Sequence, residues 1–420
     1  MFDIDRWQEI YAALKSNKLR TFLTAFGVFW GIFMLIIMLG SGKGLENSVF
    51  EDLGDFATNS AFVWTRRTTM PYKGFTRGRR YNFTNDDMKA LKDNIPEIDI
   101  LAPRLQGWGG DGENNVTHGI KTGAFTIQGD YPEMNKIDPN KIIQGRFINY
   151  KDIDQSRKVC AIGTRVREVL FEDGENPIGE YIRVKGVYFQ VVGIIAPVSN
   201  INFGGEKEQT IYLPFTALQK AYNFGNVVHY FSVTAKENIP VSVVEEKCRT
   251  LLKERHHIHP DDKQAIGGFN MEEQFAKMKG LFTGISVLIW IVGTGTLMAG
   301  VIGVSNIMLI IVKERTKEIG IQRAIGATPY RIISQIMMES VVLTALAGYI
   351  GLVVGVGLVE LINYALENSG SEGEFFRHPS VDFGIAMTAL SILVVSGAFA
   401  GLIPAQRAVS IKPIDALRDE

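Results

Sequence analysis

Four long stretches of the chain carry no charged residue and consist mainly of apolar side chains. They cover residues 21–42, 281–312, 340–359 and 383–406, and each lies between charged residues. A helix that crosses ~30 Å of hydrocarbon needs about 20 largely apolar residues, whereas helices of soluble proteins average about 11 residues. The pattern therefore predicts four transmembrane helices, over 19–42, 281–312, 340–359 and 383–406.

Lysine and arginine are concentrated in three of the segments that flank these helices. They are Arg6, Lys15, Lys18 and Arg20, then Lys313, Arg315, Lys317, Arg323 and Arg331, and finally Arg407, Lys412 and Arg418. Short basic flanks stay in the cytoplasm, so both termini (1–18 and 407–420) and the 313–339 segment are predicted to be cytoplasmic. The 43–280 segment and the acidic loop 360–382 are then extracytoplasmic. Ile4, Trp7 and Tyr11 share one helical face, which predicts an interfacial helix within 1–18.

The segment between the first two transmembrane helices alternates between strand and helix patterns. Strands are predicted over 61–64, 159–162, 183–195 with a turn at Gly186, 211–213 and 231–234. Helices are predicted from a cap at Thr84 to residue 91, after residue 215, and over 241–255. This interleaving indicates an α+β domain.

Both ends of this domain carry apolar residues at helical spacing. The first stripe is Leu45, Val49, Leu53 and Phe56, and the second is Met271, Phe275, Met278 and Phe282. The stripes continue out of the first span and into the second, so they predict a two-helix stalk that carries the domain and transmits movement.

The composition adds mainly exclusions. A net charge of −1 with 46% hydrophobic residues excludes a basic nucleic-acid-binding protein. The glycine-rich residues 40–44 lack the spacing of a phosphate-binding loop, and we interpret them as a turn where the chain leaves the membrane. No catalytic arrangement and no cofactor site is predicted.

Two further groups of residues have an ordinary structural explanation. The histidines His256, His257 and His259 lie at a predicted helix end, where imidazolium is favourable, and no second ligand pair accompanies them as in a zinc site. Cys160 and Cys248 resemble small buried hydrophobic residues more than a disulfide pair. No metal is predicted.

Three glycine pairs at a spacing of four lie in the predicted spans. They are Gly27 and Gly31, Gly351 and Gly355, and Gly397 and Gly401. Such faces let two helices approach closely, either within one chain or between two copies of it.

The 313–339 segment has the clearest local signals. A short charged helix is predicted to end at Gly326, and Thr328 with Pro329 begins the next helix, which continues into the third span. A charged helix between two spans on the ATP-rich side of the membrane is suited to docking another protein.

These residues resemble a known family. The stretch GVSNIMLIIVKERTKEIGIQRAIGATPYRIISQIMMESVVLTALAG is similar to the FtsX-like permease domain of MacB-type ABC transporters. NKLRTFLTAFGVFWGI and IPAQRAVSIKPIDALRDE are similar to the two ends of these permeases. IQGDYPEMNKIDPNKIIQGRF, NPIGEYIRVKGVYFQVVGII and IYLPFTALQKAY resemble the periplasmic core domain.

The resemblance implies a homodimer in the bacterial inner membrane, with ATP hydrolysed on a separate ATP-binding subunit. It implies a two-lobed outer domain, with an inserted lobe at about 106–222. The segment that meets the ATPase would include Glu314, Arg315, Lys317, Glu318, Gly320, Arg323 and Gly326. Movement of the outer domain, called mechanotransmission, would drive export of antibiotics, peptides or other periplasmic compounds, through an adaptor and an outer-membrane channel. Lipoprotein release and control of a cell-wall hydrolase remain alternatives.

Overall fold

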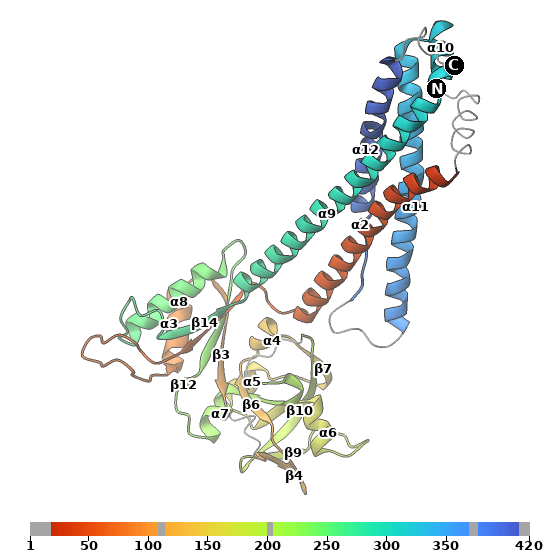
Figure 1. Ribbon diagram of the computed structural model, residues 1–420. Helices are drawn as coiled ribbons and strands as arrows, with labels where there is room; N and C mark the ends of the chain where they lie inside the picture. The colour runs from red at the N-terminus through yellow and green to blue at the C-terminus, as the bar shows by residue number, and fades with distance from the viewer. Residues whose placement is uncertain (1–17, 108–113, 200–204, 369–376, 411–420) are drawn as a thin grey trace. The chain divides into compact units, whose positions relative to one another are not determined.

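The structure is a computed structural model that describes residues 18–107, 114–199, 205–368 and 377–410 (Figure 1). Residues 1–17 of the predicted interfacial helix (1–18) and the tail after 410 lie outside these residues. The chain forms two compact units. We call them the membrane unit, Met1–Val49 with Gly280–Glu420, and the large domain, Phe50–Lys279.

The membrane unit is helical. Among the described residues, four helices are long and apolar enough to cross a membrane. They are α2 (Lys18–Leu53), α9 (Met271–Glu314), α11 (Pro329–Asn368) and α12 (Phe383–Ser410), and a short helix, α10 (Thr316–Ala324), separates α9 from α11 (Figure 1). The four predicted spans are therefore confirmed. Helices α2 and α9 are longer than the spans, because each continues into the large domain.

Small residues set the helix contacts of the membrane unit. A Cβ atom at Gly300 of α9 would lie 3.1 Å from the carbonyl oxygen of Gly27 in α2. A Cβ at Gly351 of α11 would lie 2.7 Å from the carbonyl oxygen of Phe29, also in α2. On α12, a Cβ at Gly397 would lie 2.0 Å from the Thr344 hydroxyl of α11. Helix α2 thus packs against α9 and α11, and α12 packs against α11.

The predicted turn at residues 40–44 is wrong, because α2 is continuous to Leu53. The glycines there serve helix packing. A Cβ at Gly40 would lie 2.9 Å from Val359 of α11, and one at Gly42 would lie 3.1 Å from Ile289 of α9. A glycine that permits close approach of another helix looks, in sequence, the same as one that permits a turn.

The large domain is built on a mixed sheet. Its strands are β1 (Ser60–Thr65), β3 (Ile98–Gln106), β4 (Val116–His118), β5 (Lys121–Gly123), β6 (Thr126–Asp130), β7 (Asn140–Gly145), β8 (Val159–Gly163), β9 (Tyr181–Val184), β10 (Val187–Pro197), β11 (Thr210–Pro214), β13 (Tyr230–Ala235) and β14 (Ile266–Asn270). They lie in the order β14-β1-β13-β3-β6-β11-β8-β10-β9-β4-β5, and β7 pairs with β10. The pairs β8–β10 and β6–β11 are parallel. A small ribbon joins β2 (Phe83–Thr84) to β12 (Val227–Val228).

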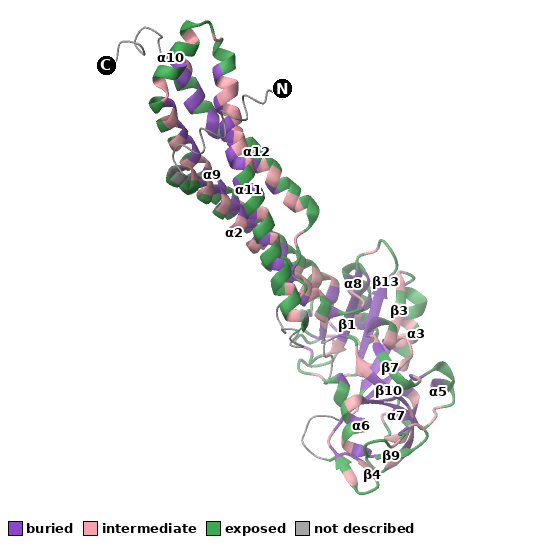
Figure 2. Ribbon diagram, turned by 90° about the vertical axis from the view of Figure 1, so that its right-hand side faces the viewer, coloured by how far each residue is buried: buried purple, intermediate pink, exposed green. Residues whose placement is uncertain are grey.

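The helices of this domain are short except for one. They are α3 (Asn85–Asn94), α4 (Met134–Ile137), α5 (Tyr150–Asp154), α6 (Thr164–Leu170), α7 (Phe215–Ala221) and α8 (Val241–Arg255), with a 3-10 turn at Lys207–Gln209. The α+β prediction is confirmed, and α8 has the predicted bounds. Strands and helices bury their apolar faces in a common core (Figure 2).

The sheet order groups the strands by their position in the sequence. Strands β4–β11 all come from residues 106–222, and they occupy one continuous end of the sheet, next to β3. Strands β14, β1, β13 and β3 form the other end. This grouping is consistent with the predicted inserted lobe, whose boundaries stay a prediction.

Candidate coupling site

The segment between α9 and α11 turns twice within fifteen residues, and local signals account for both turns. Helix α9 ends at Glu314, and Arg315 leaves helical geometry before α10 begins at Thr316. Gly326 follows α10 in the left-handed region with φ +102°, and its N–H donates to the carbonyl of Arg323. Pro329 then starts α11, where a missing N–H costs nothing. The predicted end of the short helix is thus observed.

Two arginines of the segment hold α10 against the helices on either side. Arg315 donates to the Glu339 carboxylate of α11 at 3.3 Å. Arg323, near the other end of α10, donates to the backbone carbonyl of Val409 in α12 at 2.6 Å. Between them, Ile319 and Gly320 are buried. These contacts hold α10 at both ends, so it is a firmly anchored short helix.

The opposite face of the segment is exposed and has an apolar centre. Ile321, Ile325 and Tyr330 are 45%, 82% and 80% exposed. Glu314, Lys317 and Glu318 are exposed beside them. We call these six residues the exposed tip. An apolar centre with a charged rim is the anatomy of a protein–protein contact. Glu318 of this tip also forms an ion pair with the anchoring Arg315, at 3.8 Å.

The structure separates the seven predicted coupling residues into three groups. Glu314, Lys317 and Glu318 belong to the exposed tip, Arg315 and Arg323 anchor α10, and Gly320 with Gly326 shape its packing and its end. Sequence reasoning missed Ile321, Ile325 and Tyr330. The sequence did contain a signal, because these three apolar residues lie among charged residues next to a helix end. The sequence alone, however, does not show whether such residues are exposed or part of the hydrophobic core.

The six predicted packing glycines all face helices of the same chain. Gly27 and Gly31 of α2 lie next to Gly300 and Leu297 of α9, and Gly351 and Gly355 of α11 lie next to α2. Gly397 and Gly401 of α12 lie next to Thr344 and Ser340 of α11. Their small faces are thus occupied within the single chain.

The predicted stalk residues differ in their surroundings. Leu53 and Met271 are buried in an apolar cluster with Phe56, and the rings of Phe50 and Phe275 are 5.1 Å apart. Leu45 is exposed at 38%. The remaining two, Val49 and Met278, are half-buried. Part of the apolar stripe, namely Leu53, Phe56, Met271 and Phe275, is therefore a packed cluster.

The histidines and cysteines lie apart from this site. His256 Nε2 is 2.7 Å from the buried Asp87 carboxylate, which also accepts from Arg255. Among the described residues, no group of His, Cys, Asp and Glu is arranged to hold a metal ion. Cys160 and Cys248 are buried and unpaired, and burial raises the pKa of both thiols.

Comparison with known proteins covers both units. Residues 21–251 match the MacB-like periplasmic core domain, and residues 290–413 match the FtsX-like permease C-terminal family. The macrolide export ATP-binding/permease protein MacB of Shewanella sp. (strain W3-18-1) is 28% identical over 99% of this chain and 61% of its own length. MacB of Chlorobaculum tepidum is 31% identical over 98% of this chain and 61% of its own length.

Other relatives carry a different export name. The pyoverdine export ATP-binding/permease protein PvdT of Pseudomonas entomophila is 27% identical over 99% of this chain and 60% of its own length. The crystallised periplasmic region of MacB from Actinobacillus actinomycetemcomitans aligns over 55% of this chain and 97% of its own, with 17% identity and a TM-score of 0.43. The chain spans about three fifths of the length of the curated relatives it matches.

Among the described residues, four membrane-length helices, with a large mixed α/β domain between the first and the second, are the arrangement of a multi-pass membrane protein. One family match alone extends over more than half of the chain, and the second covers most of the remainder. The chain belongs to the MacB-type ABC transporter permeases.

Proposed function

We propose that this chain is the permease of an ABC-type export complex and that an ATP-binding subunit, a separate polypeptide, docks on the exposed tip. The observation that carries the proposal is the construction of the coupling site. Two arginines pin α10 to α11 and α12, while Ile321 and Ile325 are left exposed. Because α10 is anchored to its neighbours, a displacement of the docked ATP-binding subunit is passed on to the permease helices. A loosely held helix would move by itself instead.

Helix α9 connects the coupling site to the large domain, so it can transmit this displacement. It runs without a break from Met271, directly after strand β14, to Glu314, and only Arg315 separates it from α10. Its 44 residues correspond to about 66 Å at 1.5 Å per residue. A continuous helix couples its two ends mechanically, which supports mechanotransmission: ATP-driven movement at the coupling site is carried to the large domain.

The assembly follows from the same proposal. The protein is a homodimer in the inner membrane, with its termini and coupling site in the cytoplasm and its large domain outside. The large domain meets an adaptor that leads to an outer-membrane channel. The exported compounds are antibiotics, peptides or other periplasmic compounds, as the names of the macrolide and pyoverdine exporters among the relatives suggest.

Purification of the complex from its native membrane tests the ATPase partnership. We expect an ABC-type ATP-binding subunit to co-purify as its own polypeptide. The variant Ile325→Asp should abolish that association, because it places a carboxylate in the apolar centre of the contact, and Glu314→Lys should weaken it through the rim. The matched control is Ile120→Asp, an exposed isoleucine in the large domain, which should leave association unchanged.

The result that would refute the docking site is unchanged ATPase binding and stimulation in Ile325→Asp. Deletion of the gene tests the transported class. Export predicts sensitivity to toxic compounds. Mislocalised lipoproteins would indicate lipoprotein release instead, and chained cells would indicate control of a cell-wall hydrolase.

A further inference from the structure

A basic pocket lies in the large domain on the β9–β10 hairpin, and none of its lining residues has been given a functional role above. Its volume is about 740 Å³. Its lining includes Arg146, Arg157 and Lys158, together with Tyr181, Tyr188 and Gln190. Tyr188 and Gln190 are two residues apart on β10 and therefore lie on the same face, and Tyr181 pairs with Gln190 across the hairpin. The hairpin therefore forms one wall of the pocket, with Val187 and Val192 beside these polar residues, and the three cations come from the chain segments next to it.

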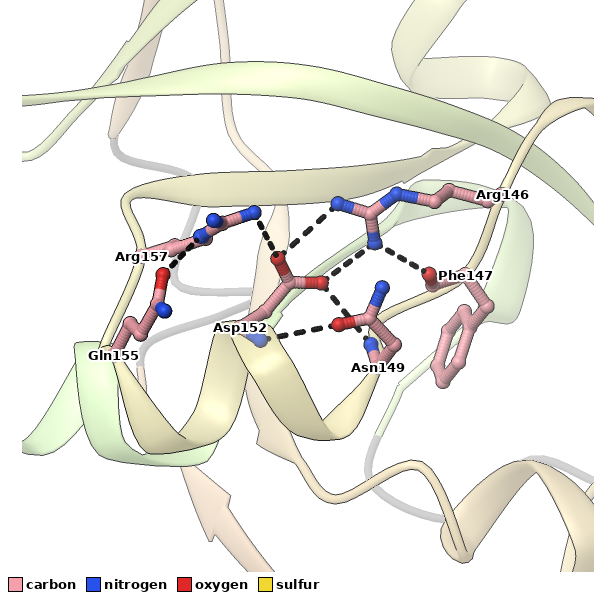
Figure 3. A network of polar contacts seen from close by, with 6 residues as sticks. All are labelled: Arg146, Phe147, Asn149, Asp152, Gln155 and Arg157. Atoms are coloured by element: carbon pink, nitrogen blue, oxygen red, sulfur yellow. Dashed lines mark hydrogen bonds and ion pairs between the residues drawn. The ribbon is translucent and has the colours of Figure 1, made fainter.

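A single buried carboxylate organises the two arginines (Figure 3). Asp152 is fully buried and accepts two hydrogen bonds from the Arg146 guanidinium, at 2.5 and 3.1 Å. Its Oδ1 lies 3.9 Å from Nη1 of Arg157. Asp152 is itself held by the backbone N–H of Asn149 at 3.0 Å. Both arginines are thus oriented before any ligand arrives.

The positively charged side chains at the pocket outnumber the carboxylates that neutralise them. One carboxylate serves two guanidinium groups and Lys158 adds a third cation, while the part of the lining that the structure describes contains no Asp or Glu. Arg157 and Arg146 each keep 40% of the side chain exposed. Arg157 donates through Nε to Gln155 at 2.8 Å, and its two terminal nitrogens carry further N–H donors. Lys158 is exposed.

The rim of the pocket adds aromatic surface. Tyr181 and Tyr188 are 54% and 58% exposed. The Arg183 guanidinium lies 6.0 Å from the centre of the Tyr188 ring. Exposed tyrosines offer both an apolar face and a hydroxyl donor, so the rim suits the organic part of a ligand whose charged groups meet the cations.

We propose that this pocket binds a small organic ligand with two or more oxyanion groups, carboxylate or phosphate. Arg157 and Lys158 hold the oxyanions through charge-assisted hydrogen bonds, Asp152 and Arg146 position them, and the two tyrosines contact the ligand body. The site requires neither ATP nor the coupling segment. Its test therefore gives an answer whether or not the proposed export function is correct.

Isothermal titration calorimetry on the full chain in uncharged nanodiscs, without an ATPase, tests the site. The two probes are citrate for carboxylate chemistry and pyrophosphate for phosphate chemistry. We expect binding of at least one probe, weakened by added salt. Lys158→Met and Arg157→Met should each weaken it about tenfold. The matched control is Lys92→Met, an exposed lysine of α3, which should bind like the wild type.

The two probes distinguish the source of the oxyanion. Citrate alone indicates a carboxylate ligand, pyrophosphate alone a phosphate ligand, and both a general oxyanion site. Absence of binding for both probes at millimolar concentration overturns the proposal, and so does equal binding by wild type and Lys158→Met. Because Lys158 is exposed, its replacement is not expected to disturb folding, and protection of the buried Cys160 thiol verifies this.

Discussion

The buried ion pair between Arg104 and Asp130 offers the sharpest test of how the large domain is held together. The two residues are cross-strand partners on β3 and β6, where the two ends of the sheet meet. Arg104 donates through Nε and Nη2 to the two carboxylate oxygens, at 2.6 and 2.8 Å. Its Nη1 donates to the Tyr230 hydroxyl at 3.1 Å. The side chains are 2% and 0% exposed.

Replacing Asp130 by Asn keeps the shape and removes the charge. Burial opposes the charge on Arg104, but the nearby carboxylate of Asp130 outweighs it and raises the pKa of the guanidinium. The variant therefore leaves a buried cation without a counter-charge. Removing one partner of a buried pair costs about 3–5 kcal/mol, which corresponds to roughly two to four powers of ten in the unfolding equilibrium.

The chain contains its own reporters for this measurement. Its two cysteines, Cys160 in β8 and Cys248 in α8, are buried and unpaired, and they lie in the two ends of the domain. Labelling of these thiols in the full chain, in detergent and at increasing urea, reports opening around each cysteine. We expect Asp130→Asn to label both at lower urea. Asp99→Asn is the control, because Asp99 is an exposed residue of the same strand β3.

Unchanged labelling in Asp130→Asn would refute the reasoning that the pair carries this part of the stability. The double variant Arg104→Met with Asp130→Leu sharpens the test. It removes both charges, so it should regain much of the stability lost in the single variant. A double variant as unstable as the single one would show that packing, not the orphaned charge, is responsible.

Two further predictions concern helix packing and pH. Gly397→Ala should lower the free energy of unfolding of the detergent-solubilised protein by about 1–3 kcal/mol, because its Cβ would lie 2.0 Å from the Thr344 hydroxyl. The control Gly357→Ala has open space around the new Cβ and should be neutral or slightly stabilising, because alanine favours a helix more than glycine does. Equal stability of the two variants would contradict the packing. Burial by itself raises the pKa of Asp87, but hydrogen bonds from His256 and Arg255 outweigh it and lower the pKa well below its usual range. This carboxylate therefore stabilises the large domain above pH ~4 and loses that contribution as pH falls toward its lowered pKa. Urea unfolding followed by circular dichroism should show a steeper acid loss in wild type than in Asp87→Asn, and identical pH profiles would contradict the assignment.

Local physics determined much of this protein from sequence alone. Charged side chains are unfavourable in the hydrocarbon core of a membrane, so the four transmembrane helices could be predicted without any tertiary information. The end of α10 and the start of α11 followed from Gly326 and Pro329, because helix ends obey rules that act within one turn. Helix α8 and strands such as β1 and β8 were predicted for the same reason: their apolar periodicity is local.

Other features depended on contacts between distant segments. Strands β3 and β6 were missed, since Pro103 and Gly129 are unfavourable strand residues that only partners on both sides make acceptable. Residues 40–44 were mistaken for a turn because the helices that cover Gly40 and Gly42 lie far away in sequence.

The coupling site shows the same division. The sequence determined that a short charged helix stands between two spans, with Glu314, Arg315 and Arg323 among its charges. Only the tertiary structure decided that Arg315 and Arg323 are anchors and that Ile325 is exposed. The physical reason is that the chemistry of a side chain is set by its residue type. Its burial and its interaction partners are set by the distant parts of the chain that the fold places beside it.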